Sequence, residues 1–345
     1  MKNKLLKLSA LLMALLILGT FALVSCSQNK SNDNADDTSE AKSLDKNLEI
    51  KIYALNGTTA LGMSQMIVNA KNGTDDMNYK IELFPSADLI SASIVSGECA
   101  IAALPTNAAA KLYKKSEGKL QLLALNTLGV LYLLDNTNSV TALNNLKGKT
   151  VYLPGKGSNP EYITAALLEG AGLKIGTDVT LDTTTYPSPD ALQAAVIAKK
   201  VDYAVLPEPK VSIVTTKNSE VNVALDLTEE WENIYGENTL VQGCLVVNKA
   251  FAEKHPLEVK KFLEDYKASV DFISEGSDKA VSTVVEAGVL PQAPIAKKAL
   301  PKCNLCCITG NDMKPAINVF YEKLYAIDPQ SIVAVPDDGF YYVSK

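Results

Sequence analysis

Two spacings of hydrophobic residues alternate along the chain from Leu48 onward. Short runs with apolar residues at every second position, or at every position, are typical of half-buried and fully buried strands. Between them lie longer segments with apolar residues three or four positions apart, which is the spacing of an amphipathic helix. The predicted strands are residues 48–55, 79–84 and 99–105, and the predicted helices are residues 60–71, 86–98 and 106–117.

The same alternation resumes further along the chain. The apolar run 120–136 is interrupted by Asn126, Thr127 and Gly129, so we predict two strands that meet at Gly129. Residues 238–276 are expected to supply a long strand and an amphipathic helix, and helices and a looped tail follow them. Between these regions the pattern predicts strands at 149–154, 179–186 and 201–209, and helices that begin at Pro160 and Pro189.

A β-α-β-α-β order of elements predicts parallel sheets covered by helices. The expected fold class is therefore α/β, with two similar lobes and a ligand cleft between them. We expect lobe 1 to comprise residues 48–140 and 244–345, and lobe 2 to comprise residues 141–243. The chain would cross between the lobes near residues 137–147 and 236–244.

Residues 1–25 have the pattern of a secretory signal peptide. Lysines precede an apolar stretch, residues 8–24, that is too short and too early to count as a spanning helix. The sequence Leu23-Val24-Ser25-Cys26 resembles a bacterial lipobox, which implies that the Cys26 thiol is lipidated and becomes the new N-terminus. An ordinary signal peptide cut near Ser25, or a retained anchor helix, is the alternative.

Residues 26–47 are expected to form a disordered tether. After Cys26 this segment contains no aromatic side chain and only alanine and leucine as apolar residues. It therefore cannot bury enough surface to offset the entropy lost on ordering. Cys26 would anchor the protein to a membrane, and the tether would let a folded domain work just outside it.

Composition narrows the range of partners. The chain has 345 residues and a net charge of −6, and each of its 33 basic residues is a lysine. Because arginine is absent, bidentate guanidinium capture of a carboxylate, phosphate or sulfonate is excluded. The mild acidity and the lack of a basic cluster also argue against nucleic acid as a partner.

The cysteines allow several interpretations. Without the lipobox cysteine an odd number remains, so they cannot all pair within one chain. Cys303, Cys306 and Cys307 have a C-x-x-C spacing that zinc and redox sites use, but no second pair of ligands accompanies it. The single histidine, His255, lies at an expected loop-to-helix junction. We expect no metal and no cofactor. Two alternatives remain open for the cysteines: a disulfide within the cluster or to Cys244, or simple packing of small thiols.

Four stretches together resemble one family. They are DLISASIVSGECAIAALP, LNNLKGKTVYLPGKGSNPEYITAALLEGAGL, KKVDYAVLPEPKVSIV and LVVNKAFAEKHPLEVKKFLEDYKASVDFI. In this order, over roughly residues 48–290, they are similar to the nitrate, sulfonate and taurine (SsuA/TauA-like) substrate-binding proteins of ABC transporters. The resemblance implies the type II periplasmic-binding-protein fold, capture of a small solute between the lobes, and delivery to a membrane permease with a cytoplasmic ATPase.

Polar turns after predicted strands are candidate ligand contacts. Ligands of open α/β sheets bind outside the carboxyl ends of the strands, where helix N-termini present free N–H groups. For Thr58 and Thr59, helix capping is an equally good explanation, and both roles can hold together. Of Thr106 and Asn107, one must cap its helix, and the other is then free for a solute. Where polar residues interrupt a buried run, a solute or backbone carbonyls could be their partners. The lobe 1 candidates are Asn56, Gly57, Thr58, Thr59, Thr106, Asn107, Asn126 and Gly129.

In lobe 2 a glycine-rich turn just before Pro160 is the best site for an anion in the chain. It is not a P-loop, since the GK[ST] ending is missing. Glu208, between two prolines at a strand end, could accept hydrogen bonds from a ligand amine or ring N–H, or be a solvated or lysine-paired carboxylate. Tyr186 and Trp231 could stack on a planar ligand or pack on their own lobe. The candidates of the glycine-rich turn are Lys156, Gly157, Ser158 and Asn159.

These features favour a solute-binding protein over an enzyme. With one histidine, no G-x-S-x-G and no dinucleotide fingerprint, few groups are left to act as nucleophile or general base. We expect a monomeric, extracytoplasmic, lipid-anchored protein that closes its lobes on a small planar, zwitterionic or anionic organic solute. A ligand-sensing or adhesive lipoprotein of the same fold, or an enzyme of pyrimidine-precursor synthesis, is the alternative.

Overall fold

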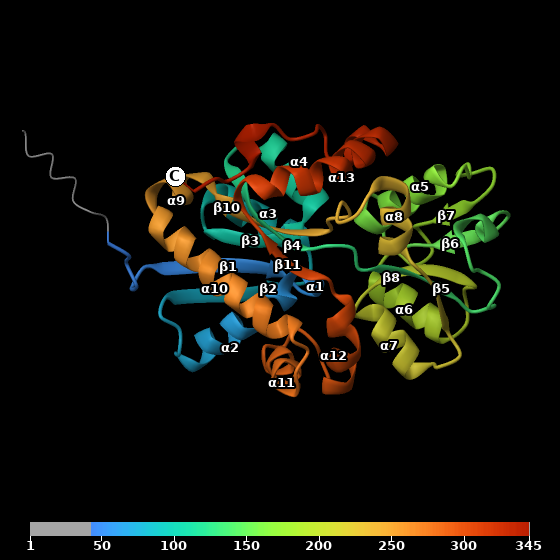
Figure 1. The fold of residues 1–345 in the computed structure, drawn as a ribbon, viewed down its shortest axis with the longest axis horizontal. Helices are drawn as coiled ribbons and strands as arrows, with labels where there is room; N and C mark the ends of the chain where they lie inside the picture. Colours follow the sequence, from blue (N-terminus) through green and yellow to red (C-terminus); the bar gives the residue numbers. More distant parts are fainter. Residues whose placement is uncertain (1–42, 345) are drawn as a thin grey trace, which may run out of the picture. The chain divides into compact units, whose positions relative to one another are not determined.

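The computed structural model describes residues 43–344, which form two lobes, each built on one β-sheet (Figure 1). The predicted signal peptide, Cys26 and the tether up to residue 42 lie outside the described residues. Residues 43–47, expected in the tether, belong to the fold. Leu44 packs on the core of lobe 1, and the Asp45 N–H donates to Glu258 Oε1 at 2.8 Å. Within the described part of the chain, every helix is too short or too polar to span a bilayer.

Lobe 1 contains a six-stranded mixed sheet with the strand order β11-β4-β10-β3-β1-β2. β1 pairs in parallel with β2 and β3, as the sequence predicts, but β10 inserts antiparallel between β3 and β4. β11 pairs antiparallel with β4 and lies where the sequence pattern predicts only helices and a tail. The strands are β1 (Glu49–Leu55), β2 (Asn78–Phe84), β3 (Ile101–Pro105), β4 (Leu120–Thr127), β10 (Gly243–Asn248) and β11 (Leu305–Ile308).

Helices cover both faces of this sheet (Figure 1). On one face lie α1 (Thr58–Leu61), α2 (Ser64–Asn72), α9 (Lys249–Lys254), α10 (Pro256–Ser274), α11 (Asp278–Glu286) and α12 (Ala293–Ala299). On the other lie α3 (Ala87–Ser96), α4 (Thr106–Lys115) and α13 (Met313–Ile327). Short 3-10 helices occupy Leu143–Leu146, Leu300–Lys302, Gly310–Asp312, Pro329–Ser331 and Asp338–Phe340.

Lobe 2 contains a five-stranded sheet with the order β7-β6-β8-β5-β9. β6 pairs in parallel with β7 and β8, whereas β5 is antiparallel to β8 and β9. Its strands are β5 (Leu131–Asp135), β6 (Thr150–Tyr152), β7 (Thr180–Asp182), β8 (Tyr203–Pro207) and β9 (Asn222–Asp226). Its helices are α5 (Asn159–Gly170), α6 (Pro189–Ile197), α7 (Lys210–Lys217) and α8 (Leu227–Tyr235).

The chain passes from lobe 1 to lobe 2 earlier than the sequence predicts. The apolar run 120–136 gives two strands as expected, but β4 joins the first sheet and β5 the second. The first crossing therefore lies at residues 128–130 instead of near 137–147, because β5 finds its partners in β8 and β9. The return crossing lies within residues 236–242, between α8 and β10.

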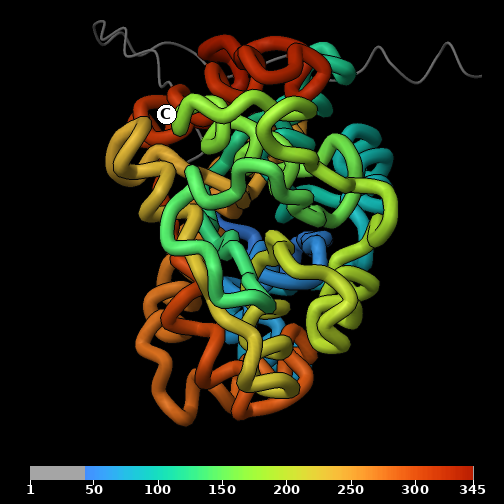
Figure 2. The backbone as a smooth tube through the Cα atoms, turned by 90° about the vertical axis from the view of Figure 1, so that its right-hand side faces the viewer, coloured from blue at the N-terminus to red at the C-terminus, as the bar shows by residue number. Residues whose placement is uncertain are grey.

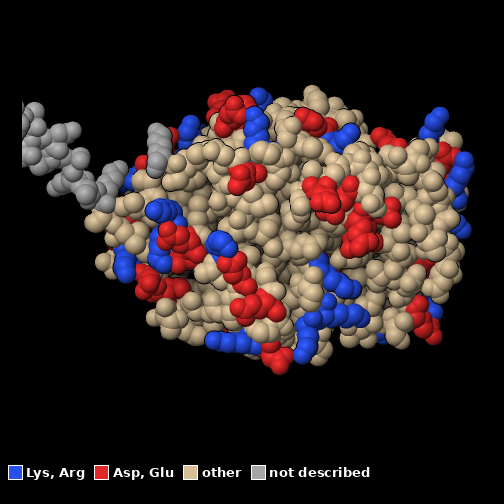
Figure 3. Space-filling model, in the orientation of Figure 1, with Lys and Arg blue, Asp and Glu red and all other residues tan. Residues whose placement is uncertain are grey.

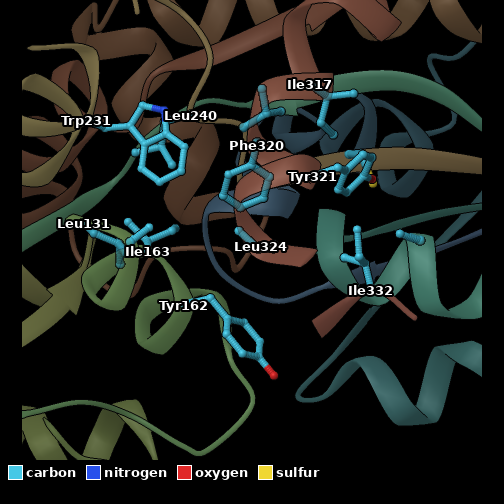
Figure 4. Packing of buried hydrophobic residues seen from close by; sticks show 14 of the residues in the cluster. Leu131, Tyr162, Ile163, Trp231, Leu240, Ile317, Phe320, Tyr321, Leu324 and Ile332 are labelled. Carbon is cyan, nitrogen blue, oxygen red and sulfur yellow. The ribbon is translucent and has the colours of Figure 1, made fainter. Parts of the chain in front are cut away.

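One hydrophobic core runs from lobe 1 into lobe 2 along α13 (Figure 4). Phe320 of α13 packs on Trp231 of α8, with the ring centroids 5.7 Å apart. Leu324 of α13 and Ile163 of α5 belong to the same buried cluster. Seen with lobe 2 towards the viewer, the red C-terminal helix lies directly above the green segments of lobe 2 (Figure 2). The two lobes are thus joined by packing as well as by the two crossings.

Candidate functional site

A cleft of about 590 Å³ lies between the two lobes. The turns that follow β1 and β3 line it from lobe 1, and the turns that follow β6 and β8 line it from lobe 2. Val130 and Gln242 of the crossing segments complete the wall. The volume is in the range of small-molecule pockets, and the position at the carboxyl ends of strands is where open α/β sheets bind ligands. Of the residues predicted from the sequence, Asn56, Gly57, Thr58, Thr59, Asn107, Lys156, Gly157, Ser158, Asn159 and Glu208 line this cleft.

The lobe 1 turn, residues 55–59, takes its shape from Gly57. The Gly57 backbone has φ 121° and ψ −150°, a region that glycine alone adopts readily. α1 begins directly after it, and no side chain of the described residues caps this helix. Thr59 Oγ1 donates to the Leu55 carbonyl at 2.8 Å. The Thr59 hydroxyl can therefore only accept a further hydrogen bond from a solute, whereas the Thr58 hydroxyl can donate or accept.

The start of α4 separates two residues that the sequence treats as equivalent. Thr106 is fully buried and its hydroxyl donates to the Val241 carbonyl at 2.8 Å, so Thr106 does not line the cleft. Asn107 does line it, in the first turn of a helix that no side chain of the described residues caps. Lys111, one turn further on, also lines the cleft, and burial together with the charge of Lys115 lowers the pKa of its ammonium.

The lobe 2 turn, residues 155–159, is partly occupied by the chain itself. The Gly157 N–H donates to a carboxylate oxygen of Glu161 in the first turn of α5. Ser158 Oγ donates to the carbonyls of Pro154 and Gly155, at 2.9 and 2.8 Å. Fewer groups of this turn are thus free to bind an anion than the sequence suggests. The Gly157 N–H is already bonded to the Glu161 carboxylate, and the Ser158 hydroxyl is bonded to two carbonyls. What remains is the start of α5, which no side chain of the described residues caps.

Glu208 lines the cleft from the end of β8 and is fully buried. Its carboxylate accepts hydrogen bonds from the Ser212 N–H at 3.1 Å and from Ser212 Oγ at 3.0 Å, so it caps α7. Burial raises the pKa of Glu208, while the Ser212 hydrogen bonds and the charges of Lys302 and Lys298 act in the opposite direction. A carboxylate has about four acceptor sites, so Glu208 can accept a further hydrogen bond from a solute.

Asn126 and Gly129 do not line the cleft. Asn126 is fully buried, and its Nδ2 donates to the Thr59 carbonyl at 3.1 Å while its Oδ1 accepts from Thr127 Oγ1 at 3.0 Å. Gly129 packs closely on Thr228, where an added Cβ would lie 2.2 Å from the hydroxyl oxygen. The polar atoms of Asn126 therefore find their hydrogen-bond partners within the chain. Asn126 positions the lobe 1 turn instead of binding a solute.

The two aromatic candidates also lie outside the cleft. Tyr186 packs on Tyr152, with the ring centroids 5.8 Å apart. Trp231 is fully buried in the core shared by the lobes (Figure 4), and its indole N–H donates to Thr239 Oγ1 at 3.0 Å. The expectation that either ring stacks on a solute does not hold, because each is already packed against other side chains.

The five cysteines of the described residues are free thiols. Strand alternation in β11 directs Cys306 to the core on the α13 side and Cys307 to the core on the α10 side. Burial raises the pKa of Cys306 to about 12 and that of Cys307 to about 11. Among residues 43–344, no group of three histidine, cysteine or acidic side chains could hold a metal ion. Of the alternatives, packing of small thiols describes these cysteines.

Several charged or polar residues in the cleft carry no sequence signal. Asp88 and Lys210 line it, and the Lys210 ammonium pairs with Asp190. Gln242 lies in the return crossing, which is neither a strand end nor a helix start, so no turn pattern marks it. On the outer face shown in Figure 3, lysines and carboxylates are interspersed. A charge preference for a solute therefore has to come from the cleft itself.

The two α/β lobes around a cleft have the type II fold of solved periplasmic substrate-binding proteins. Residues 119–280 match the NMT1/THI5 like family. The resemblance to the nitrate, sulfonate and taurine group of substrate-binding proteins is confirmed by this match together with the solved structures below. No curated protein matches the sequence of this chain.

Three solved structures illustrate the similarity. An ABC transporter structure from Parabacteroides distasonis has a TM-score of 0.72 and 23% identity, over 87% of this chain and 100% of that chain. The periplasmic aliphatic sulphonate binding protein SsuA from Escherichia coli has a TM-score of 0.70 and 15% identity, over 86% and 92%. The periplasmic nitrate-binding protein NrtA from Synechocystis has a TM-score of 0.55 and 13% identity, over 70% and 67%. At these identities the likeness establishes the fold.

Proposed function

We propose that this chain is an extracytoplasmic solute-binding lipoprotein of an ABC importer, anchored through Cys26, that captures a small organic solute and delivers it to the permease. The observation that carries the proposal is the cleft of about 590 Å³ at which turns of both lobes meet. The NMT1/THI5 like match and the likeness to SsuA support a binding role in import. The solute would stabilise a closed arrangement because it contacts both lobes at once.

The charges of the cleft favour a solute with both negative and hydrogen-donating groups. Lys111, Lys156 and Lys210 line it, and so do residues in the first turns of α4 and α5, whose positive helix ends favour a negative group. Glu208 and Asp88 supply acceptors and negative charge in the same space. A zwitterion, or an organic anion with an N–H group, matches this set better than a bare inorganic anion.

The cleft also favours binding over catalysis. No histidine or cysteine of the described residues lines it. The single histidine, His255, packs its ring on Phe251 between α9 and α10, with centroids 4.9 Å apart. Ser212 Oγ donates to Glu208, but Ser212 is fully buried and does not line the cleft, so this hydroxyl is not presented to a solute as a nucleophile.

The proposal is tested by purifying residues 27–345 and recording native mass spectra before and after denaturing extraction. We expect a stoichiometric small-molecule adduct that is lost on denaturation. Lys156→Glu, which reverses a charge on the cleft wall, should reduce the affinity for that solute at least about tenfold. Lys149→Glu, on a lysine outside the cleft, should leave it unchanged. An apo mass together with silence in a thermal-shift panel of sulfonates, amino acids and vitamin precursors would count against solute capture and favour an adhesive role.

A further inference from the structure

Backbone groups fix the orientation of two amide side chains in the cleft. Gln242 Oε1 accepts from the Val130 N–H at 2.7 Å. Because an N–H can only donate, the oxygen of this amide faces Val130 and its Nε2 faces away. Asn159 Nδ2 donates to the Gln242 carbonyl at 3.3 Å, so in the same way Asn159 Oδ1 points away from that carbonyl.

Each of these amides keeps one polar atom unused. Asn159 is 7% exposed, and its Oδ1 is buried with no partner among the described residues. Gln242 is 8% exposed, and its Nε2 donates to no group of residues 43–344, although its Oε1 and its carbonyl are both used. Buried polar atoms are normally paired, so an unpaired acceptor in the wall of a cleft indicates a partner that the chain does not supply.

The two unused atoms belong to two residues on different parts of the fold that are in contact, since the Asn159 side chain donates to the Gln242 carbonyl. Asn159 is the first residue of α5 in lobe 2, and Gln242 lies in the return crossing to lobe 1. The Gln242 carbonyl also accepts from the Thr106 N–H at 3.1 Å, which holds it against the start of α4. A donor and an acceptor, each on an amide held by a backbone group, thus belong to two residues that line the same cleft where both lobes meet.

We propose that Asn159 and Gln242 together recognise a solute edge with an N–H group beside a hydrogen-bond acceptor. A carboxamide, a lactam and an amino-substituted heterocycle present such an edge, whereas nitrate, sulfate and simple alkanesulfonates do not. The pair accepts the solute N–H at Asn159 Oδ1 and donates to its acceptor from Gln242 Nε2. This assignment rests on the proposed solute binding and narrows the class of solute; the helix starts and Lys156 then take the negative part of the molecule.

Matched probes test the pair directly. 5-Oxopyrrolidine-2-carboxylate and 5-oxotetrahydrofuran-2-carboxylate differ only in a ring N–H that is replaced by oxygen. 4-Aminopyrimidine-5-carboxylate and its dimethylamino analogue differ in the two amino hydrogens, which methyl groups replace in the analogue. Calorimetry on residues 27–345 should show binding by at least one N–H probe, and its matched analogue should bind at least about tenfold more weakly, because the analogue leaves the Asn159 acceptor unpaired.

Two variants and one control assign the discrimination to these residues. Asn159→Leu keeps the size of the side chain and removes the acceptor, so the ratio of affinities within a probe pair should fall towards one. Gln242→Glu keeps an oxygen for the Val130 N–H and removes the donor, so the affinity for both members should fall at least about tenfold. Asn318→Leu removes an amide of α13 that lies outside the cleft, so its ratio should match that of the unaltered protein. Thermal unfolding of each variant separates a lost contact from a lost fold.

The outcomes separate this inference from the proposed function. A co-purified oxyanion without an N–H group, equal binding of both members of a pair, or discrimination that survives in Asn159→Leu would overturn the inference and leave solute binding in place. A chain that carries no solute and binds none of these probes would contradict both. A co-purified amide, lactam or amino-heterocycle that the Asn159 variant no longer distinguishes from its analogue would support both.

Discussion

The two glycine-containing turns on either side of the cleft look alike in sequence and differ in what they leave free. In the lobe 1 turn, Gly57 precedes an uncapped helix and Thr59 is bonded back to Leu55. In the lobe 2 turn, the Gly157 N–H is bonded to the carboxylate of Glu161. Both turns end a strand and start a helix, which is the arrangement that predicts an anion site. Only the lobe 2 turn carries its own negative charge.

The difference shows that a helix start is an anion site only when the chain does not fill it. A glutamate in the first turn is favourable for the helix, because it complements the positive end of the dipole. The same carboxylate competes with any anionic solute for the same N–H groups. In lobe 2 the Glu161 carboxylate therefore stabilises the start of α5 and lowers the affinity of this turn for an anion. In lobe 1 no such carboxylate is bonded to the turn, and its shape depends on the backbone conformation of Gly57.

The largest effect should come from the glycines. Gly57→Ala places a side chain at φ 121° and ψ −150°, which should lower the free energy of unfolding by about 1–3 kcal/mol although open space surrounds the position. Gly157→Asn, at φ 74°, should cost about 1 kcal/mol or less, because asparagine tolerates the left-handed region. Urea unfolding measures both. Equal losses of unfolding free energy in the two variants would show that the backbone conformations of Gly57 and Gly157 restrict a side chain to the same extent.

A smaller effect should follow from removing the charge of the lobe 2 turn. Glu161→Gln keeps an oxygen for the Gly157 N–H and removes a negative charge from the cleft. We expect the affinity for an anionic solute to rise about two- to fivefold, and more at low salt. Glu169→Gln, at the other end of α5, is the matched control and should change nothing. An unchanged affinity in the Glu161 variant would mean that the solute does not approach the start of α5.

The hydroxyls of the two turns should contribute similar amounts of stability. Thr59→Val removes one hydrogen bond to a carbonyl, and Ser158→Ala removes a hydroxyl that is shared between two carbonyls. Each variant should lose about 1 kcal/mol of unfolding free energy by urea titration. A much larger loss at Ser158 alone would identify the lobe 2 turn as the more strongly held of the two.

The smallest effect should be the pH dependence of the unfolding free energy that arises from Glu208. Because burial raises its pKa above the ordinary value of 4.5, the folded state binds the proton more tightly than the unfolded state. The stability that Glu208 contributes is therefore complete below pH 4.5 and is lost as the pH rises through the folded pKa.

Glu208→Gln should lack this loss. The unfolding free energy of the variant, relative to that of the unaltered protein, should increase from pH 4.5 towards neutral pH. Ser212→Ala removes the hydroxyl that lowers the pKa of Glu208. The loss of unfolding free energy with rising pH should therefore be larger in this variant than in the unaltered protein. A flat difference across this range would show that Glu208 keeps its ordinary pKa in the fold.

Strand-end turns were predictable because local sequence alone sets them. Gly57, Asn107 and Gly157 stand where a strand pattern stops and a helix pattern starts, and the carboxyl ends of such strands point to one edge of a sheet. The two-lobed α/β fold follows from the same alternation. Glu208 was found for a similar reason, since it lies between two prolines directly after an apolar run.

What the sequence could not supply depends on partners far away in the chain. Trp231 has acidic neighbours in the sequence, which suggests an exposed ring that could contact a solute. In the fold, Phe320 of the distant helix α13 packs on this ring. β10 resembles any other strand, and only pairing shows that it runs antiparallel between β3 and β4. The Gln242 amide takes its orientation from the Val130 N–H, and its carbonyl holds the Asn159 side chain. Such contacts join distant segments, so no local pattern encodes them.

The strand order of lobe 1 has a consequence for the order in which the protein can fold. Every strand and helix of lobe 2 lies between Leu131 and Tyr235, so this lobe is complete once that continuous stretch has been synthesised. Lobe 1 has to wait, because β10 is inserted in the middle of its sheet, and β11 and α13 come later still. The half of the protein that begins first is therefore finished last.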